Sequence, residues 1–90
     1  MIHSLKIKKE YFNEVASERK TFEIRKNDRD FHTGDILALN EIDKSGKYTG
    51  NSLLCKVVYI LDSFEGLAPG YVAMSVKVFM EDRGETKDFI

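Results

Sequence analysis

Hydrophobic and polar residues alternate along most of this chain, as they do in strands that bury one face and expose the other. This pattern predicts strands at 3–8, 21–25 and 71–79. Strands are also predicted at 36–42 and at 53–61, which is rich in β-branched and aromatic residues. Between residues 9 and 17 the apolar residues instead recur at helical spacing, which predicts one short amphipathic helix. The segments 43–50 and 62–70 are rich in turn residues and are predicted to connect the later strands directly.

The parity of the apolar residues predicts which side chains form the core. In segment 53–61, the side chains of one parity are Leu53, Cys55, Val57, Tyr59 and Leu61. In segment 71–79, the inward set is Val72, Met74, Val76 and Val78. The strand 21–25 differs, because it places two apolar side chains on one face and Thr21, Glu23 and Arg25 on the other. We expect that polar face to line a cleft.

These elements predict one mostly β (α+β) domain over residues 1–80, followed by a charged, flexible tail over 81–90. Strands joined by short turns, without a helix between each pair, do not build the layers of a βαβ sheet. The expected architecture is a small mixed, mainly antiparallel β-barrel of five or six strands with one or two helices.

Composition and chain ends indicate a cytoplasmic protein. The 90 residues are 42% hydrophobic and 32% charged, which is ordinary for a globular domain. No apolar run approaches the roughly 20 residues of a membrane span, and the start of the chain lacks the apolar stretch of a signal peptide. The single cysteine, Cys55, fits a reducing compartment and is expected to be a small buried hydrophobic residue. We expect a monomer with no membrane partner.

Charge is unevenly distributed along the chain, although the net charge is only −1. Residues 1–30 carry eight Lys or Arg and six Asp or Glu, whereas residues 61–90 carry three and six. Any face that binds an anion is therefore expected to come mainly from the first third.

The chain lacks the sequence motifs of several common binding and catalytic sites. The chain has no Gly-x-Gly-x-x-Gly, no P-loop and no Gly-x-Ser-x-Gly, which gives no support for dinucleotide, phosphate-loop or hydrolase-elbow chemistry. His3 and His32 are isolated from other potential ligands, so we expect no metal site and no cofactor.

The dense group of charged residues at 19–29 is the strongest functional signal. A guanidinium group offers paired donors to phosphate or to a base edge, and a carboxylate accepts from exocyclic amines. Tyr48, in the predicted turn at 43–50, is a candidate platform on which an unpaired base could stack. The residues predicted to bind a nucleic acid or nucleotide are Lys20, Thr21, Glu23, Arg25, Asn27, Arg29 and Tyr48. The competing interpretation is a surface ion pair between Glu23 and Arg25 worth ~0–1 kcal/mol.

Several motifs resemble a small bacterial and phage family of unknown function in the PUA-like superfamily, near its ASCH branch. The resemblance covers almost the whole chain and is most specific in Lys-Thr-Phe-Glu-Ile-Arg at 20–25, followed by Gly-Asp at 34–35. It also includes the starting segment 3–7, the Tyr-Phe pair at 11–12 and Tyr-Thr-Gly at 48–50. The resemblance implies a small β-barrel with a helix packed at one end, a cleft beside the helix and the second strand, and RNA or modified nucleotides as ligands.

Two departures from that family bear on the site. Glu18 stands where the family usually has Gly, at a helix end where a left-handed residue other than Gly costs up to about 1 kcal/mol. Some ASCH relatives resemble amidohydrolases that remove an acyl group from a modified cytidine. That resemblance matches Lys20 to their lysine, places Glu23 at their threonine position, and leaves Glu41 and Glu65 as candidates for a distant glutamate.

The sequence therefore supports three hypotheses. The preferred one is an RNA- or nucleotide-binding module. The first alternative is an amidohydrolase acting on an acylated cytidine-like nucleoside, with Lys20 and Glu23 as catalytic candidates. The second is a phage-type protein-interaction module without catalysis.

Overall fold

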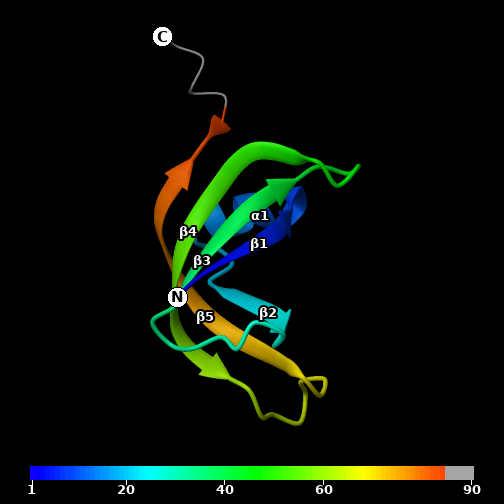
Figure 1. Cartoon of the computed structure of the whole chain (residues 1–90), viewed down its shortest axis with the longest axis vertical. Helices are drawn as coiled ribbons and strands as arrows, with labels where there is room; N and C mark the ends of the chain where they lie inside the picture. The colour runs from blue at the N-terminus through cyan, green and yellow to red at the C-terminus, as the bar shows by residue number, and fades with distance from the viewer. Residues whose placement is uncertain (85–90) are drawn as a thin grey trace.

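The alternating pattern produces strands where the sequence predicts them. The computed structural model describes residues 1–84, and its elements in chain order are β1 (Ile2–Lys8), α1 (Lys9–Ala16), β2 (Phe22–Lys26), β3 (Ile36–Ile42), β4 (Tyr48–Leu61) and β5 (Tyr71–Asp82). The five strands form one strongly curled sheet, a half-barrel, with the short helix packed inside its curve (Figure 1). The predicted mostly β, mainly antiparallel fold with one helix is confirmed, and the barrel is open on one side.

The strand order across the sheet is β1-β3-β4-β5-β2. β1 pairs with β3 in parallel, and the other three pairs, including β2 with β5, are antiparallel. β1 and β2 are therefore the two edges, each with one side that pairs with no other strand of the sheet. These free edges bound the open side of the half-barrel.

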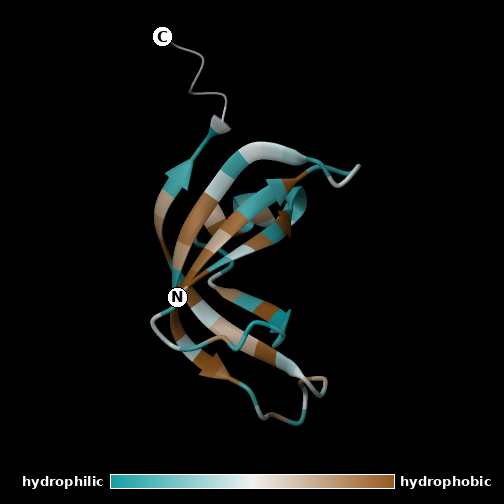
Figure 2. Ribbon diagram, in the orientation of Figure 1, coloured by the Kyte–Doolittle hydropathy of each residue, from teal (hydrophilic) through white to brown (hydrophobic). Residues whose placement is uncertain are grey.

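The core lies on the concave face of the sheet. Phe12 and Val15, three residues apart on α1, are fully buried there because they share one face of the helix. They pack with inward side chains of the strands, which are Leu5, Ile7, Leu37, Leu39, Leu53, Cys55, Val57, Val72, Met74 and Val76. Figure 2 shows the hydrophobic and hydrophilic bands that this alternation produces along the strands.

The predicted inward set of β4 is correct up to Val57 and wrong beyond it. The pairing of β4 with β5 shifts register between Val57 and Tyr59, which is the mark of a β-bulge. The extra residue reverses the parity, so that Tyr59 is 63% exposed and Ile60, rather than Leu61, packs against the core. The inward set of β5 is confirmed, with Val78 partly buried at the margin of the core.

β5 continues to Asp82, so the structure places the first two residues of the predicted tail in a strand. Residues 85–90 lie outside the described part of the chain, and the boundary between domain and tail stays a prediction. Within residues 1–84, no helix is long and apolar enough to cross a bilayer.

The turn after α1 adopts the conformation for which Gly is best suited. Glu18 has a φ of 62°, in the left-handed region. Its backbone N–H donates to Val15 O at 3.0 Å, and the N–H of Lys20 donates to Glu14 O at 2.9 Å, which closes the end of the helix. The chain thereby reverses its direction within a few residues after α1, and β2 begins beside this helix.

Candidate functional site

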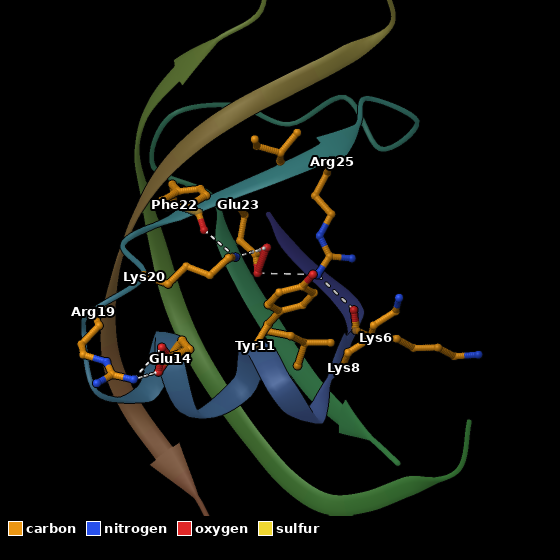
Figure 3. A pocket seen from close by; sticks show the side chains of 11 residues that line it. Lys6, Lys8, Tyr11, Glu14, Arg19, Lys20, Phe22, Glu23 and Arg25 are labelled. Carbon is orange, nitrogen blue, oxygen red and sulfur yellow. Dashed lines mark hydrogen bonds and ion pairs between the residues drawn. The ribbon is translucent and has the colours of Figure 1, made fainter. Parts of the chain in front are cut away.

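A cleft of about 700 Å³ opens between β1, α1 and β2, and we call it the β1–β2 cleft (Figure 3). Lys6 and Lys8 line it from β1, because their side chains have the opposite parity to the buried Leu5 and Ile7. α1 contributes Tyr11, and β2 and the turn before it contribute a group of charged and apolar side chains. The cleft therefore combines the two free edges of the sheet with one face of the helix.

Glu23 lies at the base of this cleft and is only 4% exposed. Its Oε2 accepts a hydrogen bond from Lys20 Nζ at 3.2 Å, and its Oε1 lies 3.6 Å from Arg25 Nη2. Within the described residues, Oε1 is buried and has no hydrogen-bond partner. Leaving a buried acceptor unpaired costs about 1–3 kcal/mol. The base of the cleft therefore holds an acceptor that a ligand donor can satisfy.

The ammonium group of Lys20 is held by four neighbouring groups. In addition to Glu23, it donates to Phe22 O at 2.9 Å. It also lies 4.9 Å from the centre of the Phe22 ring and 5.5 Å from that of Tyr11, at cation–π distance. All four contacts stabilise a cation. The two rings are about half exposed and form apolar walls above the glutamate.

Two arginines cross the open side of the half-barrel to the free edge of β1. Arg25 Nη2 donates to Lys6 O at 3.0 Å, and Arg29 Nη1 donates to Ser4 O at 3.1 Å. Residues 4 and 6 share one parity, so both carbonyls point away from β3 and out of the sheet. These contacts bring the loop after β2 against β1 and hold the two edges together.

A second hollow of about 440 Å³ continues from the first along β1, and we call it the Tyr48 hollow. Lys6 and Arg25 line both hollows, and Arg29 lines the second. Tyr48 is 62% exposed, and Lys6 Nζ lies 5.8 Å from the centre of its ring. The structure corrects the predicted position of this tyrosine, which is the first residue of β4 rather than part of the turn.

The two hollows form one strongly cationic surface on an otherwise slightly acidic chain. Their lining holds seven Lys or Arg and three carboxylates, a net charge of +4, against −1 for the whole sequence. The cations are Lys6, Lys8, Arg19, Lys20, Arg25, Lys26 and Arg29. All of them fall within the first 30 residues, the third of the sequence in which the charge pattern locates a cationic face. Such a surface attracts anions.

Two of the residues predicted to bind line neither hollow. The carbonyl of Thr21 accepts from Val76 N at 3.0 Å and so extends the pairing of β2 with β5. The side-chain oxygen of Asn27 accepts from Phe31 N at 3.2 Å and shapes the loop after β2. The structure gives both residues structural contacts, whereas Lys20, Glu23, Arg25, Arg29 and Tyr48 all line one hollow or both.

The resemblance places the cleft beside the helix, but the residues predicted to bind include none of the side chains that β1 and α1 contribute. Lys6, Lys8 and Tyr11 lie opposite β2 and complete the β1–β2 cleft. The available signal was the alternation of the two lysines with buried residues, which places both cations on one face of β1. The order of strands in the sheet decides which strand lies opposite that face, and the alternation alone does not give this order.

Neither candidate for the distant glutamate lines the cleft. Glu41 is buried in β3, where its Oε1 accepts from Thr49 Oγ1 at 2.7 Å and from Asn51 Nδ2 at 2.9 Å. Glu65 lies exposed in the connection between β4 and β5. The thiol of Cys55 is fully buried in the core, and this burial, together with the negative charge of Glu23, raises the pKa of Cys55 to about 12. The thiol is thus protonated near neutral pH.

A separate polar cluster stabilises the start of β3. Asp35 Oδ2 lies 2.8 Å from His3 Nε2 and accepts from the backbone N–H of His32 at 2.9 Å. The hydrogen bond with His3, followed by the one with His32, holds the pKa of Asp35 well below its usual range. His3 also meets the ring of Phe31 edge-on at 4.8 Å. Within residues 1–84, no three potential metal ligands lie close enough together to hold an ion.

The protein is thus a curled β half-barrel whose open side carries a cationic cleft. It belongs to a family described as a domain of unknown function, DUF3850, whose model matches residues 2–76. An uncharacterized 12.9 kDa protein from the GpA 3′ region of Escherichia phage P2 is 34% identical over 61 residues, which are 68% of this chain and 55% of the phage protein. The chain therefore spans about half the length of that relative.

A solved structure supports the fold alone. The crystal structure of hypothetical protein PH0355 is similar, with a TM-score of 0.59 and 21% sequence identity. The similarity covers 88% of this chain and all of the other.

Proposed function

We propose that this protein is an RNA- or nucleotide-binding module of the PUA/ASCH-like type, and that it takes an unpaired base into the β1–β2 cleft. The observation that carries the proposal is Oε1 of Glu23, which has no hydrogen-bond partner within residues 1–84 and is buried at the base of a cleft with aromatic and cationic walls. A ligand that fits must present an N–H donor, a flat apolar surface and a negative charge. A nucleotide with an amino-bearing base has all three.

Each wall of the cleft corresponds to one part of such a ligand. The carboxylate of Glu23 accepts from an exocyclic amine or a ring N–H of the base. Tyr11 and Phe22 offer ring surface on which a base can stack, an interaction worth about 1–3 kcal/mol per base. Lys6 and Arg25 lie at the open end, where a phosphate can accept from them.

The position of the charges favours this ligand over a cationic one. A cationic ligand could also pair with Glu23, but it would have to approach through a surface with a net charge of +4. Within the cleft, Lys20 and Arg25 already provide two positive charges next to the single buried carboxylate. Oε1 can still accept a hydrogen bond, and a neutral donor such as a base N–H is enough to provide it.

The test is a titration with the four ribonucleoside monophosphates and with a pool of short single-stranded RNA. Calorimetry or fluorescence measures the binding. We expect saturable binding that weakens with salt at a slope of about −0.7 per phosphate contacted. Lys20→Ala and Arg25→Ala should each raise the Kd by about 10-fold or more. Lys44→Ala removes the same charge from the exposed turn between β3 and β4 and is the matched control. Absence of saturable binding at low salt would contradict the proposal.

One geometric observation favours an amidohydrolase as a second candidate. Lys20 and Glu23 form a close pair inside a cleft, as a nucleophile or proton-transfer group requires. Against it, Lys20 Nζ is already engaged within the protein by Phe22 O, Glu23 and two aromatic rings. Incubation with N-acylated cytidine separates the candidates, and we expect no release of cytidine. Turnover that both Lys20→Ala and Glu23→Gln abolish would establish the enzyme instead.

A further inference from the structure

The β1–β2 cleft and the Tyr48 hollow are consecutive along the free edge of β1. The first is lined by Lys6, Ile7 and Lys8, and the second by Ser4, Leu5 and Lys6. The five residues from 4 to 8 span about 13 Å in an extended strand. Stacked nucleotides rise by ~3.4 Å each along a strand, so this edge has room for two bases even with a protein side chain between them.

The junction of the hollows is built from two cations. Lys6 and Arg25 line both hollows, and no acidic side chain is shared between them. Arg25 uses Nη2 for both Lys6 O and Glu23, which leaves the other two nitrogens of its guanidinium group for a ligand. A phosphate at this position would lie between the two hollows. That is where the linkage between two nucleotides must lie if each hollow takes one base.

The second hollow has its own stacking surface. Tyr48 is exposed, and Lys6 Nζ lies over its ring at cation–π distance. Arg29 lies in the same hollow and is positioned by its bond to Ser4 O. An aromatic face next to fixed cations is the arrangement by which proteins bind unpaired bases along a strand.

We propose that the ligand is an unpaired RNA strand of at least two nucleotides rather than a free nucleotide. One base enters the β1–β2 cleft and meets Glu23, the connecting phosphate lies at Lys6 and Arg25, and the neighbouring base stacks on Tyr48. This inference rests on the proposed function, because it extends the same site by one nucleotide.

The experiment compares one nucleotide with two. Calorimetry first identifies which of the four ribonucleoside monophosphates binds most tightly, and then measures the ribodinucleotides that contain that nucleotide. We expect the best dinucleotide to bind at least about fivefold more tightly than the mononucleotide, the lower end of what one base–aromatic stack contributes. Tyr48→Ala should bring this ratio close to one, and Tyr48→Phe should retain it.

Tyr59→Ala is the matched control, because Tyr59 is as exposed as Tyr48 but lies at the bulge of β4, away from both hollows. It should leave the ratio unchanged. Equal affinity for one and two nucleotides, or a ratio that survives Tyr48→Ala, would overturn the inference while leaving the proposed function intact. Failure of every mononucleotide and dinucleotide to bind would overturn both.

Discussion

Replacing Glu23 by Gln should weaken base recognition strongly while leaving the stability of the fold almost unchanged. Glu23 Oε2 makes one charge-assisted hydrogen bond, with Lys20, which contributes about 1.5–3 kcal/mol. Its buried Oε1 makes none to any residue of the described part of the chain, which costs about 1–3 kcal/mol. The two effects are similar in size and opposite in sign. Glutamine weakens both, so we expect the free energy of unfolding to change by no more than about 1 kcal/mol.

Binding should respond differently, because the ligand donor meets Oε1, which has no hydrogen-bond partner within the described residues and lies 3.6 Å from Arg25 Nη2. Loss of a charge-assisted bond to the base should raise the Kd by roughly 10- to 100-fold. Urea unfolding, monitored by circular dichroism, measures the free energy of unfolding. Calorimetry with the nucleotide that binds most tightly measures the Kd. Both are needed on the same protein preparation.

Glu41→Gln is the matched control, because Glu41 is equally buried but its Oε1 already accepts two hydrogen bonds, from Thr49 and Asn51. We expect it to lose about 1–2 kcal/mol of stability, as charge-assisted bonds become neutral ones, and to bind nucleotides normally. A loss of 3 kcal/mol or more in Glu23→Gln, with affinity unchanged, would refute the reasoning. Glu23 would then be part of a structural ion pair.

Three further predictions concern the scaffold. The pKa of Asp35 is lowered in the fold, so the unfolded chain binds more protons in acid, and the stability this carboxylate contributes above about pH 4 is lost below it. Asp35→Asn should therefore flatten the acid limb of a urea-unfolding profile, and an unchanged limb would contradict this. Because burial raises the pKa of Cys55 to about 12, a thiol reagent near pH 8 should label it only as fast as the protein unfolds, whereas faster labelling would show a local opening. Glu18→Gly should raise the free energy of unfolding by about 0.5–1 kcal/mol by relieving the left-handed conformation, whereas Glu10→Gly inside α1 should lower it.

Strands could be predicted from the sequence wherever one face of the sheet is buried. The strand predicted at 36–42 has the bounds of β3, because its inward residues Leu37 and Leu39 meet the core. The same rule failed at Tyr59. A bulge depends on how β4 pairs with β5, and no Gly or Pro in that stretch of β4 signals it. The parity of a residue therefore predicts whether its side chain faces the core only up to the residue at which the strand pairing shifts register.

Part of the candidate site could also be predicted from the sequence. Glu23 and Arg25 were predicted because the parity of β2 separates them from Phe22 and Ile24, and Lys20 was predicted because it flanks that strand. Hydropathy alone would have buried those two apolar residues, but β2 is an edge strand, and its inward position is taken by Glu23. The partnership with β1 was not predictable, because it follows from a strand order in which β1 joins β3 and β2 joins β5.

The open side of the half-barrel explains why the side chains that we propose for binding also stabilise the fold. A free strand edge exposes unpaired backbone groups and invites association with other chains. Here Arg25 and Arg29 cover two carbonyls of the β1 edge, and each needs only one guanidinium nitrogen to do so. Their remaining donors then line the two hollows as fixed cations. Closing the barrel with a sixth strand would satisfy the same carbonyls, but it would remove both arginines from the opening and fill the space in which a base could reach Glu23.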